Sequence, residues 1–380
     1  SIQDVEVFFE ELKGFHEQFH DCFLRSESRE HFLQYMSGQF SDLERKSIEP
    51  IAFNVKGGKV RAMQRFVSDA PWADEKIMSK YRSMVNHDFG SPNGALIFDE
   101  SGFVKKGQDS VGVARQYCGT IGKVENCQVG VFASYVSDIG YTLVDKRLFI
   151  PEKWFTEEYR ERREKCKMPD TLEFQTKPQL AAEMLNCLAQ EETLPFKYVL
   201  ADSVYSSPEF IGTVEALIGV TYFISVAKDT LCWLQNPISV KKQYKYRGKV
   251  KTKTELVDTS QKPIQVSELA QNINSFFWYR RKVSEGTKGP IVYEFTRRRV
   301  RLSHEGLPQK ELWLVIRRTL GSNPEYDYFI SNAPVSTRLP TFVWLSGLRW
   351  AIEQCFEETK TDLGMDQYEV RKFPGWHHHI

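Results

Sequence analysis

The 380-residue chain is predicted to adopt an α/β fold, and three features of its sequence support this prediction. Residues 1 to about 90 carry apolar side chains at helical spacing. Residues 93–228 alternate short apolar runs, typical of strands, with longer helical patterns. Residues 231–335 are rich in Thr, Val, Tyr and Trp and contain glycine-rich turns, which indicates β-structure. We therefore expect a mixed sheet, an N-terminal helical region and a β-rich segment.

Individual elements can be placed within the alternating segment. The predicted elements are strands at 95–98, 126–135, 141–149, 198–201 and 222–226, and a helix at 177–188. Two of these strands are wholly apolar, as is typical of buried central strands, and each is followed by an aspartate. We expect Asp99 at the tip of the strand 95–98 and Asp202 at the tip of the strand 198–201.

A third acidic residue lies in a predicted helix near the C-terminus. At 3.6 residues per turn, Arg349, Glu353 and Lys360 fall within roughly 40° of one another on the helix surface. Ile352 and Phe356 lie beside this stripe at i, i+4 spacing and can pack against a core. The charged face is therefore expected to line a pocket.

These acidic residues and their neighbours resemble the DDE transposases of bacterial insertion sequences, an RNase H-like superfamily. Residues 98–107, 110–123 and 126–130 are similar to the family's segment around its first Asp, here Asp99. Ala201-Asp202-Ser203 stands where the second Asp belongs, and Arg349-x3-Glu353-x6-Lys360 has the spacing of the third motif. Ser346 replaces the tyrosine that usually precedes the arginine. Similar segments recur from about residue 40 to the end.

The resemblance implies a domain organisation and a chemistry. It implies an N-terminal helical DNA-binding domain (1–92), an RNase H-like core in two parts (93–230 and 336–380) and a β-rich insertion between them (231–335). Asp99, Asp202 and Glu353 would be the catalytic residues and the metal ligands. Two Mg²⁺ ions, or Mn²⁺ in their place, suit such oxygen donors and the cleavage of a phosphodiester. Any one acid alone is more simply explained as a solvated residue.

The implied function is a transposase that cuts phosphodiesters at transposon ends and joins the freed 3′-hydroxyl to target DNA. Its partners would be double-stranded DNA, as transposon ends and target, and a second copy of the chain. A domesticated, non-catalytic DNA-binding protein of the same fold is the alternative, but such a protein needs no cation site. A carboxylate-pair glycoside hydrolase would account for paired acids without accounting for the basic segment.

The charge distribution agrees with DNA binding. The net charge is only +1, but residues 241–318 hold nineteen Lys or Arg and seven Asp or Glu, whereas residues 1–53 hold five and eleven. Basic residues can bind backbone phosphates while neighbouring aromatic rings stack on bases. The competing interpretation of residues 241–318 is an ordinary solvated charged surface. Trp278 could stack on a base or belong to a core. The predicted DNA contacts are Arg349, Lys360, Lys105, Lys106, Arg115, Lys123, Trp278, Arg280, Arg281, Arg297, Arg298 and Arg299.

Other features narrow the class of protein. The chain has no apolar run of about 20 residues and no signal-like N-terminus, so we expect a cytoplasmic, nucleoid-associated bacterial protein without membrane contact. The seven cysteines are widely spread and lack a C-x-x-C pair, which favours reduced thiols. For the histidines at 377–379 we expect a structural or DNA-facing role in preference to metal ligation.

Overall fold

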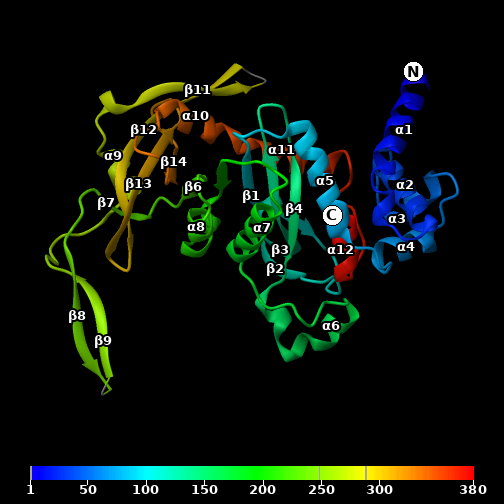
Figure 1. Ribbon diagram of the computed structural model, residues 1–380, viewed down its shortest axis with the longest axis horizontal. Coiled ribbons are helices and arrows are strands. Elements are labelled where there is room, and N and C mark those ends of the chain that lie inside the picture. The colour runs from blue at the N-terminus through cyan, green and yellow to red at the C-terminus, as the bar shows by residue number, and fades with distance from the viewer. Residues whose placement is uncertain (1, 248, 287–288) are drawn as a thin grey trace. The chain divides into compact units, whose positions relative to one another are not determined.

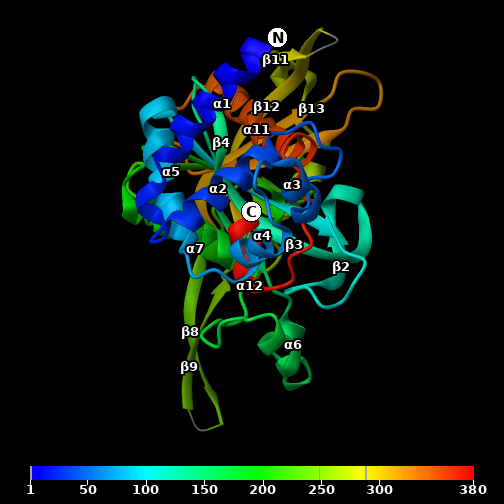
Figure 2. The ribbon, with the colours of Figure 1, turned by 90° about the vertical axis from the view of Figure 1, so that its right-hand side faces the viewer.

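The computed structural model describes residues 2–247, 249–286 and 289–380 (Figures 1 and 2). Outside this description lie Ser1, in the predicted helical region, and Gly248, Thr287 and Lys288, in the predicted β-rich segment. The chain divides into two compact units. Unit 1 comprises Ser1–Phe196 and Trp350–Ile380, and unit 2 comprises Lys197–Arg349. The domain boundaries given above remain predictions.

The N-terminal part of unit 1 is helical, as predicted. Its helices are α1 (Ile2–Glu17), α2 (Ser26–Gln39), α3 (Ile48–Asn54), α4 (Val60–Ser68) and α5 (Asp74–Phe89). Helix α4 illustrates why this segment is helical: its apolar residues recur at the spacing of one helix face. Its residues Met63, Phe66 and Val67 are buried on one side, while Arg61 and Arg65 are exposed on the other.

Unit 1 also contains an antiparallel sheet with helices on both faces. Its strands are β1 (Ala95–Val104), β2 (Ala114–Cys118), β3 (Lys123–Val136) and β4 (Tyr141–Phe149), and β3 pairs with each of the others. Its remaining helices are α6 (Arg160–Lys165), α7 (Lys177–Glu191), α11 (Trp350–Thr361) and α12 (Phe373–His379). Thr176 and Gln179 form a capping box that starts α7.

One predicted element needs correction. Strand β1 does not end at Phe98 but continues to Val104, so Asp99 lies in the middle of the strand and not at its tip. The Asp-Glu-Ser-Gly sequence has the composition of a turn, yet all of it pairs with β3. Gly102 fits there because an added Cβ would lie 2.5 Å from the Cys118 sulfur. Pairing along the whole strand outweighs the local preference.

Unit 2 contains a mixed sheet. Its strands are β5 (Tyr198–Ala201), β6 (Thr221–Val226), β7 (Leu231–Trp233), β10 (Ile264–Gln265), β11 (Tyr279–Gly286), β12 (Gly289–His304), β13 (Leu307–Arg318) and β14 (Tyr326–Ser331). Strands β5 and β6 are parallel and are joined through α8 (Pro208–Glu215), whereas the other pairs are antiparallel. The other helices of unit 2 are α9 (Val266–Gln271) and α10 (Leu339–Leu348).

Two strands of unit 2 form a separate sheet. β8 (Ser239–Tyr246) and β9 (Lys249–Leu256) pair with each other in an antiparallel ribbon, which Figure 1 shows in yellow-green. The structure also has short 3₁₀ helices, which are η1 (His20–Cys22), η2 (Gly119–Ile121), η3 (Glu152–Phe155), η4 (Glu157–Tyr159), η5 (Ser203–Tyr205) and η6 (Ser275–Phe277).

The predicted fold class is confirmed: the protein is α/β, with a mixed sheet and N-terminal helices, as an RNase H-like protein would be. All seven cysteines are free thiols, in agreement with the prediction. Among the described residues, no helix combines the length and the apolar character that a bilayer crossing requires.

Candidate active site

Asp99 lies on a defined face of the sheet in unit 1. It is opposite Phe132 of β3, and residues opposite each other on paired strands point to the same face. Phe103 lies on the same face, and its ring meets that of Phe132 edge-on with centroids 6.4 Å apart. The Asp99 carboxylate is partly exposed and accepts a hydrogen bond of 2.8 Å from the backbone N–H of Glu100.

Helix α11, which carries Glu353, packs on that same face. The Phe356 ring contacts the Phe132 ring edge-on at 5.2 Å, and Ile352 is fully buried. These are the two residues predicted to hold the helix against a core. Glu353 is exposed and precedes Phe356 by three residues, which is about one turn or 4.5 Å along the axis. Asp99 and Glu353 therefore belong to one face of unit 1.

The direction of α11 supports this placement. At the start of the helix, Trp350 packs edge-on against Tyr141 of β4, with ring centroids 5.2 Å apart. Tyr141 is opposite Val136, which is opposite Ala95, the first residue of β1. The helix thus runs alongside β1 in the same direction, and Glu353 lies between its two points of attachment.

Lys360 provides the attachment at the other end of α11. Its ammonium donates to the carbonyl of Gly102 at 3.2 Å and to the Thr120 hydroxyl at 2.9 Å. It also lies 5.2 Å from the centre of the Phe103 ring. Burial lowers the pKa of this ammonium. Lys360 thus ties α11 to β1 three residues beyond Asp99.

The second aspartate, Asp202, belongs to unit 2. It follows β5 directly, and its carboxylate accepts a hydrogen bond from the backbone N–H of Ser203 at the start of η5. The other carboxylate oxygen is 3.3 Å from the Arg349 guanidinium, with side-chain exposures of 36% for Asp202 and 28% for Arg349. Arg349 was predicted to contact phosphate and to share a helix with Glu353 and Lys360. In this structure it has a carboxylate partner, and it caps the end of α10, whereas the helix of Glu353 and Lys360 begins at Trp350.

The acidic neighbours of the predicted ligands lie in different surroundings. Glu100 follows Asp99 and so points to the opposite face of β1, where its carboxylate is 2.8 Å from the ammonium of Lys177 at the start of α7. Glu357 is exposed on α11, one turn beyond Glu353. Glu100 is thus separated from Asp99 by the sheet, whereas Glu357 lies on the same helix as Glu353.

The donor set suits hard divalent cations. Asp99, Asp202 and Glu353 offer carboxylate oxygens, the ligands that Mg²⁺ and Mn²⁺ prefer. All three have exposed or partly exposed side chains, so ions and water can reach them. Within the described ranges, no three His, Cys, Asp or Glu side chains form a ready-made metal cluster. The chemistry of the donors, and not a preformed cage, is what fits a metal ion.

The predicted DNA contacts in unit 1 separate into two groups. Lys105 is held internally, because its ammonium donates to the Tyr368 carbonyl at 3.0 Å and lies 3.2 Å from the centre of the Tyr368 ring. Burial lowers its pKa to about 8. Lys106, Arg115 and Lys123 are exposed around β2 and its flanking loops, where phosphate could reach them.

In unit 2 most of the predicted arginines lie over aromatic rings. Arg298 lies 4.6 Å from the Phe277 ring, and Arg281 lies 5.8 Å from the Tyr279 ring. Arg297 lies 4.5 Å from the Trp313 ring, beside a cavity of about 290 Å³ that Arg281 and Arg298 also line. These guanidinium groups thus lie within cation–π distance of aromatic rings, which is a common arrangement for arginine.

The remaining predicted contacts of unit 2 have internal partners. Arg280 is 3.7 Å from Glu294, and Arg299 is 3.1 Å from Glu311. Trp278 is 8% exposed and lies beneath the Arg318 guanidinium at 4.0 Å. The indole has a core environment, so stacking on a DNA base would require its exposure.

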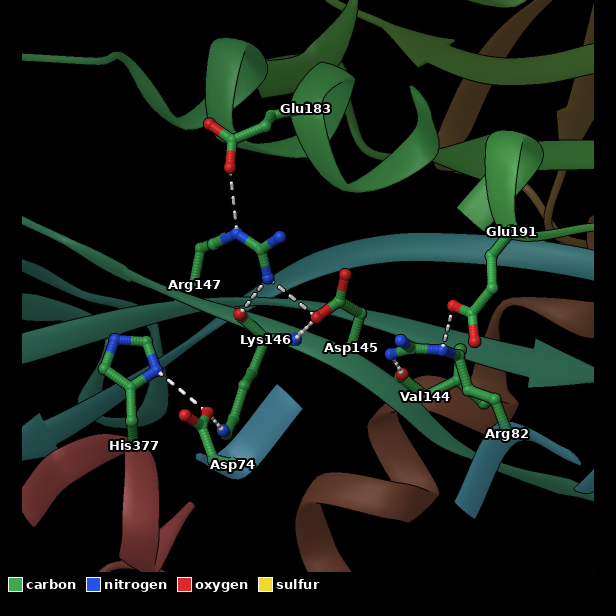
Figure 3. A network of polar contacts seen from close by, with 9 residues as sticks. All are labelled: Asp74, Arg82, Val144, Asp145, Lys146, Arg147, Glu183, Glu191 and His377. Atoms are coloured by element: carbon green, nitrogen blue, oxygen red, sulfur yellow. Dashed lines mark hydrogen bonds and ion pairs between the residues drawn. The ribbon is translucent and has the colours of Figure 1, made fainter. Parts of the chain in front are cut away.

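A charged cluster in unit 1 was not predicted. Asp145, Lys146 and Arg147 of β4 meet Asp74, Glu183 and His377 from α5, α7 and α12 (Figure 3). Several of these residues line a cavity of about 690 Å³. The only local indication is three consecutive charged residues within a largely apolar strand. Their partners are distant in sequence.

The histidines at 377–379, for which a structural or DNA-facing role was expected, make internal contacts. The His378 ring stacks on Trp72 at 3.7 Å and contacts the carbonyls of Val67 and Trp72. His379 bridges the Tyr35 hydroxyl at 2.6 Å and the Met365 carbonyl at 3.0 Å. These contacts attach α12 to the N-terminal helices.

Comparison with known proteins identifies the family. The sequence model of a family described as DDE superfamily endonuclease matches residues 18–290. Because this match covers well over half of the chain, the protein belongs to the DDE superfamily of endonucleases. The matched region includes Asp99 and Asp202 and ends before Arg349 and Glu353.

A similarity to a particular protein refines this assignment. The chain is 25% identical over 339 residues to a protein of Microchaete diplosiphon described as a probable transposase for insertion sequence element IS701. The similarity covers 89% of this chain and 76% of that protein. The resemblance to insertion-sequence transposases that was predicted from the motifs is confirmed.

Proposed function

We propose that the protein is a transposase that cuts phosphodiesters at the ends of an insertion sequence and transfers the freed 3′-hydroxyl to target DNA. The observation that carries this proposal is the position of Asp99 and Glu353 on one face of unit 1, in a chain of the DDE endonuclease family. Its substrate is double-stranded DNA, and two copies of the chain would hold the two ends. This substrate would place the protein at the bacterial nucleoid.

Asp99, Asp202 and Glu353 would hold two divalent metal ions. When bound, such ions activate an attacking water or 3′-hydroxyl and stabilise the leaving oxygen. The rigid support of Asp99 comes from its position within a fully paired strand. Glu353 is supported by Ile352 and Phe356, which hold α11 on the sheet.

Two basic residues would assist at the phosphate. Two of the three N–H donors of Lys360 are used by Gly102 and Thr120, which leaves a donor for a phosphate oxygen near Asp99. Arg349 would neutralise Asp202 until a cation takes its place there. The guanidinium would then be available for bidentate phosphate contact.

The decisive experiment is a cleavage assay on DNA that carries the element's ends, with Mg²⁺ or Mn²⁺. We expect Asp99→Ala, Asp202→Ala and Glu353→Ala each to lower the cleavage rate by about 1,000-fold or more, since each removes charge stabilisation from the transition state. DNA affinity should remain nearly unchanged.

Glu357→Ala is the matched control, because it removes an acid from the next turn of the same helix. It should retain most of the cleavage activity. DNA binding by the unaltered protein with no cutting under any divalent ion would instead favour the non-catalytic descendant.

A further inference from the structure

The β8–β9 ribbon has an unusual distribution of charge. Residues 239–256 contain seven Lys or Arg and one Glu, and every residue from Ser239 to Tyr246 is exposed. The ribbon is a sheet of its own, apart from the larger sheet of unit 2 (Figure 1). An isolated two-stranded hairpin is marginally stable in water. Repulsion among the positive charges weakens such a ribbon further. The positive charge therefore does not serve the stability of the ribbon and requires a different explanation.

The pairing register divides the ribbon into two different faces. Lys242 is opposite Lys253, Tyr244 is opposite Lys251, and Tyr246 is opposite Lys249. Because side chains alternate along a strand, these six residues share one face. We call it the lysine–tyrosine face. The other face carries Lys241, Gln243, Lys245, Val250, Thr252 and Thr254.

The lysine–tyrosine face has features that protection of the strand edges does not explain. Edge strands often carry lysine to prevent aggregation, but such protection does not call for exposed aromatic rings. Tyr244 is 45% exposed and Tyr246 is 49% exposed. The Lys251 ammonium lies 4.8 Å from the centre of the Tyr246 ring. Cations beside exposed rings form a surface suited to a polyanion.

Within this face the cations are not equally neutralised. Lys242 and Lys253 share Glu255, at 3.3 and 3.4 Å. This carboxylate relieves the repulsion between two lysines that lie directly opposite each other. Lys249 and Lys251 lie further toward the tip, beside the tyrosines, where their attraction for an external anion is least reduced.

We propose that the β8–β9 ribbon is an arm that binds double-stranded DNA through its lysine–tyrosine face. The DNA major groove, about 12 Å wide, admits a two-stranded β-ribbon, whose strands are about 4.8 Å apart. Eight residues per strand extend over about 25 Å, long enough for lysines to reach phosphates on both sides of the groove. The choice of duplex DNA as partner rests on the proposed function.

The first test removes the ribbon at its base. Ser239 is opposite Leu256, and the Val257 N–H donates to the Ile238 carbonyl at 2.9 Å, so Asn-Gly can replace residues 240–255 as a two-residue turn. Affinity for a fluorescent mixed-sequence duplex is measured between about 50 and 200 mM NaCl. If the arm neutralises about four phosphates, its removal should lower the affinity by about 30-fold or more and make the log–log salt slope shallower by about 3 to 4.

The second test separates the two faces without altering the backbone. Lys249→Gln with Lys251→Gln removes two charges from the lysine–tyrosine face, and Lys241→Gln with Lys245→Gln removes two charges from the other face. The first pair should weaken duplex binding about five-fold more than the second. Equal effects of the two pairs of substitutions would overturn the assignment of DNA binding to the lysine–tyrosine face. This test keeps the full chain, so it remains valid if the shortened protein does not fold.

Other outcomes would also overturn the proposal. The proposal is overturned if removal of residues 240–255 leaves both the duplex affinity and its salt dependence unchanged. It is also overturned if the removal lowers the affinity for single-stranded DNA only. A change only in self-association, measured by sedimentation, would make the ribbon a contact between copies. Cleavage is a separate measurement. If the protein binds duplex DNA through the ribbon but never cuts it, the proposed DNA-binding role of the ribbon stands and the proposed transposase function is rejected.

Discussion

Lysine has opposite roles in two regions of the molecule. In unit 1, Lys146 is 5% exposed and its ammonium is 2.8 Å from the Asp74 carboxylate, within the cluster of Figure 3. Arg147 in the same cluster contacts Asp145 at 2.8 Å and Glu183 at 3.2 Å. In the β8–β9 ribbon of unit 2, seven cations accompany a single Glu on an exposed surface.

The difference shows that residue type alone does not define the role of a charge. Removing an ion from water is costly, so a buried lysine is tolerated only where opposite charges compensate it. Burial alone would raise the pKa of the Asp74 carboxyl, but His377 and Lys146 hold it well below its usual range. His377 is 3.6 Å away, so Lys146 is the closer partner. Exposed cations keep their attraction for an external polyanion.

The largest effect is expected from removing the buried cation. Lys146→Met keeps an apolar side chain of similar length but leaves the Asp74 carboxylate without its closest cation. Breaking a buried pair in this way should lower the free energy of unfolding by about 3–5 kcal/mol. Urea denaturation at neutral pH measures this change.

The matched control makes the same substitution in an exposed pair. Lys165 is 2.8 Å from Glu161, but both side chains are more than two-thirds exposed. Lys165→Met should leave the free energy of unfolding unchanged within error, because solvent screens such pairs. If the two substitutions destabilise the protein equally, burial does not distinguish the two kinds of charge.

A smaller effect is expected from pH. Burial lowers the pKa of His379 to about 4, well below the ordinary value of 6.5. The unfolded chain therefore binds more protons between these values, so the stabilisation is complete above pH 6.5 and is lost as the pH falls toward 4. Between pH 7 and pH 5, this histidine should cost about 2 kcal/mol of stability.

The His379→Gln variant tests the assignment. Glutamine keeps polar contacts for the Tyr35 hydroxyl and the Met365 carbonyl but cannot take up a proton in this range. The difference in unfolding free energy between pH 7 and pH 5 should therefore be smaller by about 2 kcal/mol. The same pH dependence in both proteins would assign it to other groups.

The smallest effect concerns the single acid of the ribbon. Hydrogen bonds from Lys242 and Lys253 lower the pKa of the Glu255 carboxyl, so it is charged at neutral pH and opposes a nearby phosphate. Glu255→Gln should tighten duplex DNA binding by about two- to three-fold at low salt, with no change in the melting temperature. Fluorescence anisotropy measures the affinity.

Glu305→Gln is the control for this prediction. It removes the same charge from an exposed position between β12 and β13, outside the ribbon. Its effect on DNA affinity should be smaller than that of Glu255→Gln. Weaker binding by the Glu255→Gln variant would contradict the proposed orientation of the arm.

Local patterns predicted much of the secondary structure. The strands at 141–149 and 198–201 have the predicted bounds, although only the second is an uninterrupted apolar run. β1 is longer than predicted, because its pairing with β3 overrides a turn-like composition. The helix of Glu353 was predictable because Ile352 and Phe356 repeat at the spacing of a buried face.

The internal partners of the charged residues were not predictable. Lys105 was predicted to contact DNA, yet its ammonium lies over Tyr368, a residue 263 positions away. The Asp74–Lys146 pair likewise joins α5 to β4 across 72 positions. No pattern within a window of the sequence contains both partners of such a contact.

The sequence by itself indicated most of the helices and strands through periodicity, and its motifs showed the resemblance to the family that the comparison confirmed. The acidic residues proposed for metal chemistry were chosen from the same motifs. Only the tertiary structure decided which basic residues are occupied internally and which face solvent. Burial and charge pairing depend on segments that are distant along the chain and meet only when the chain folds.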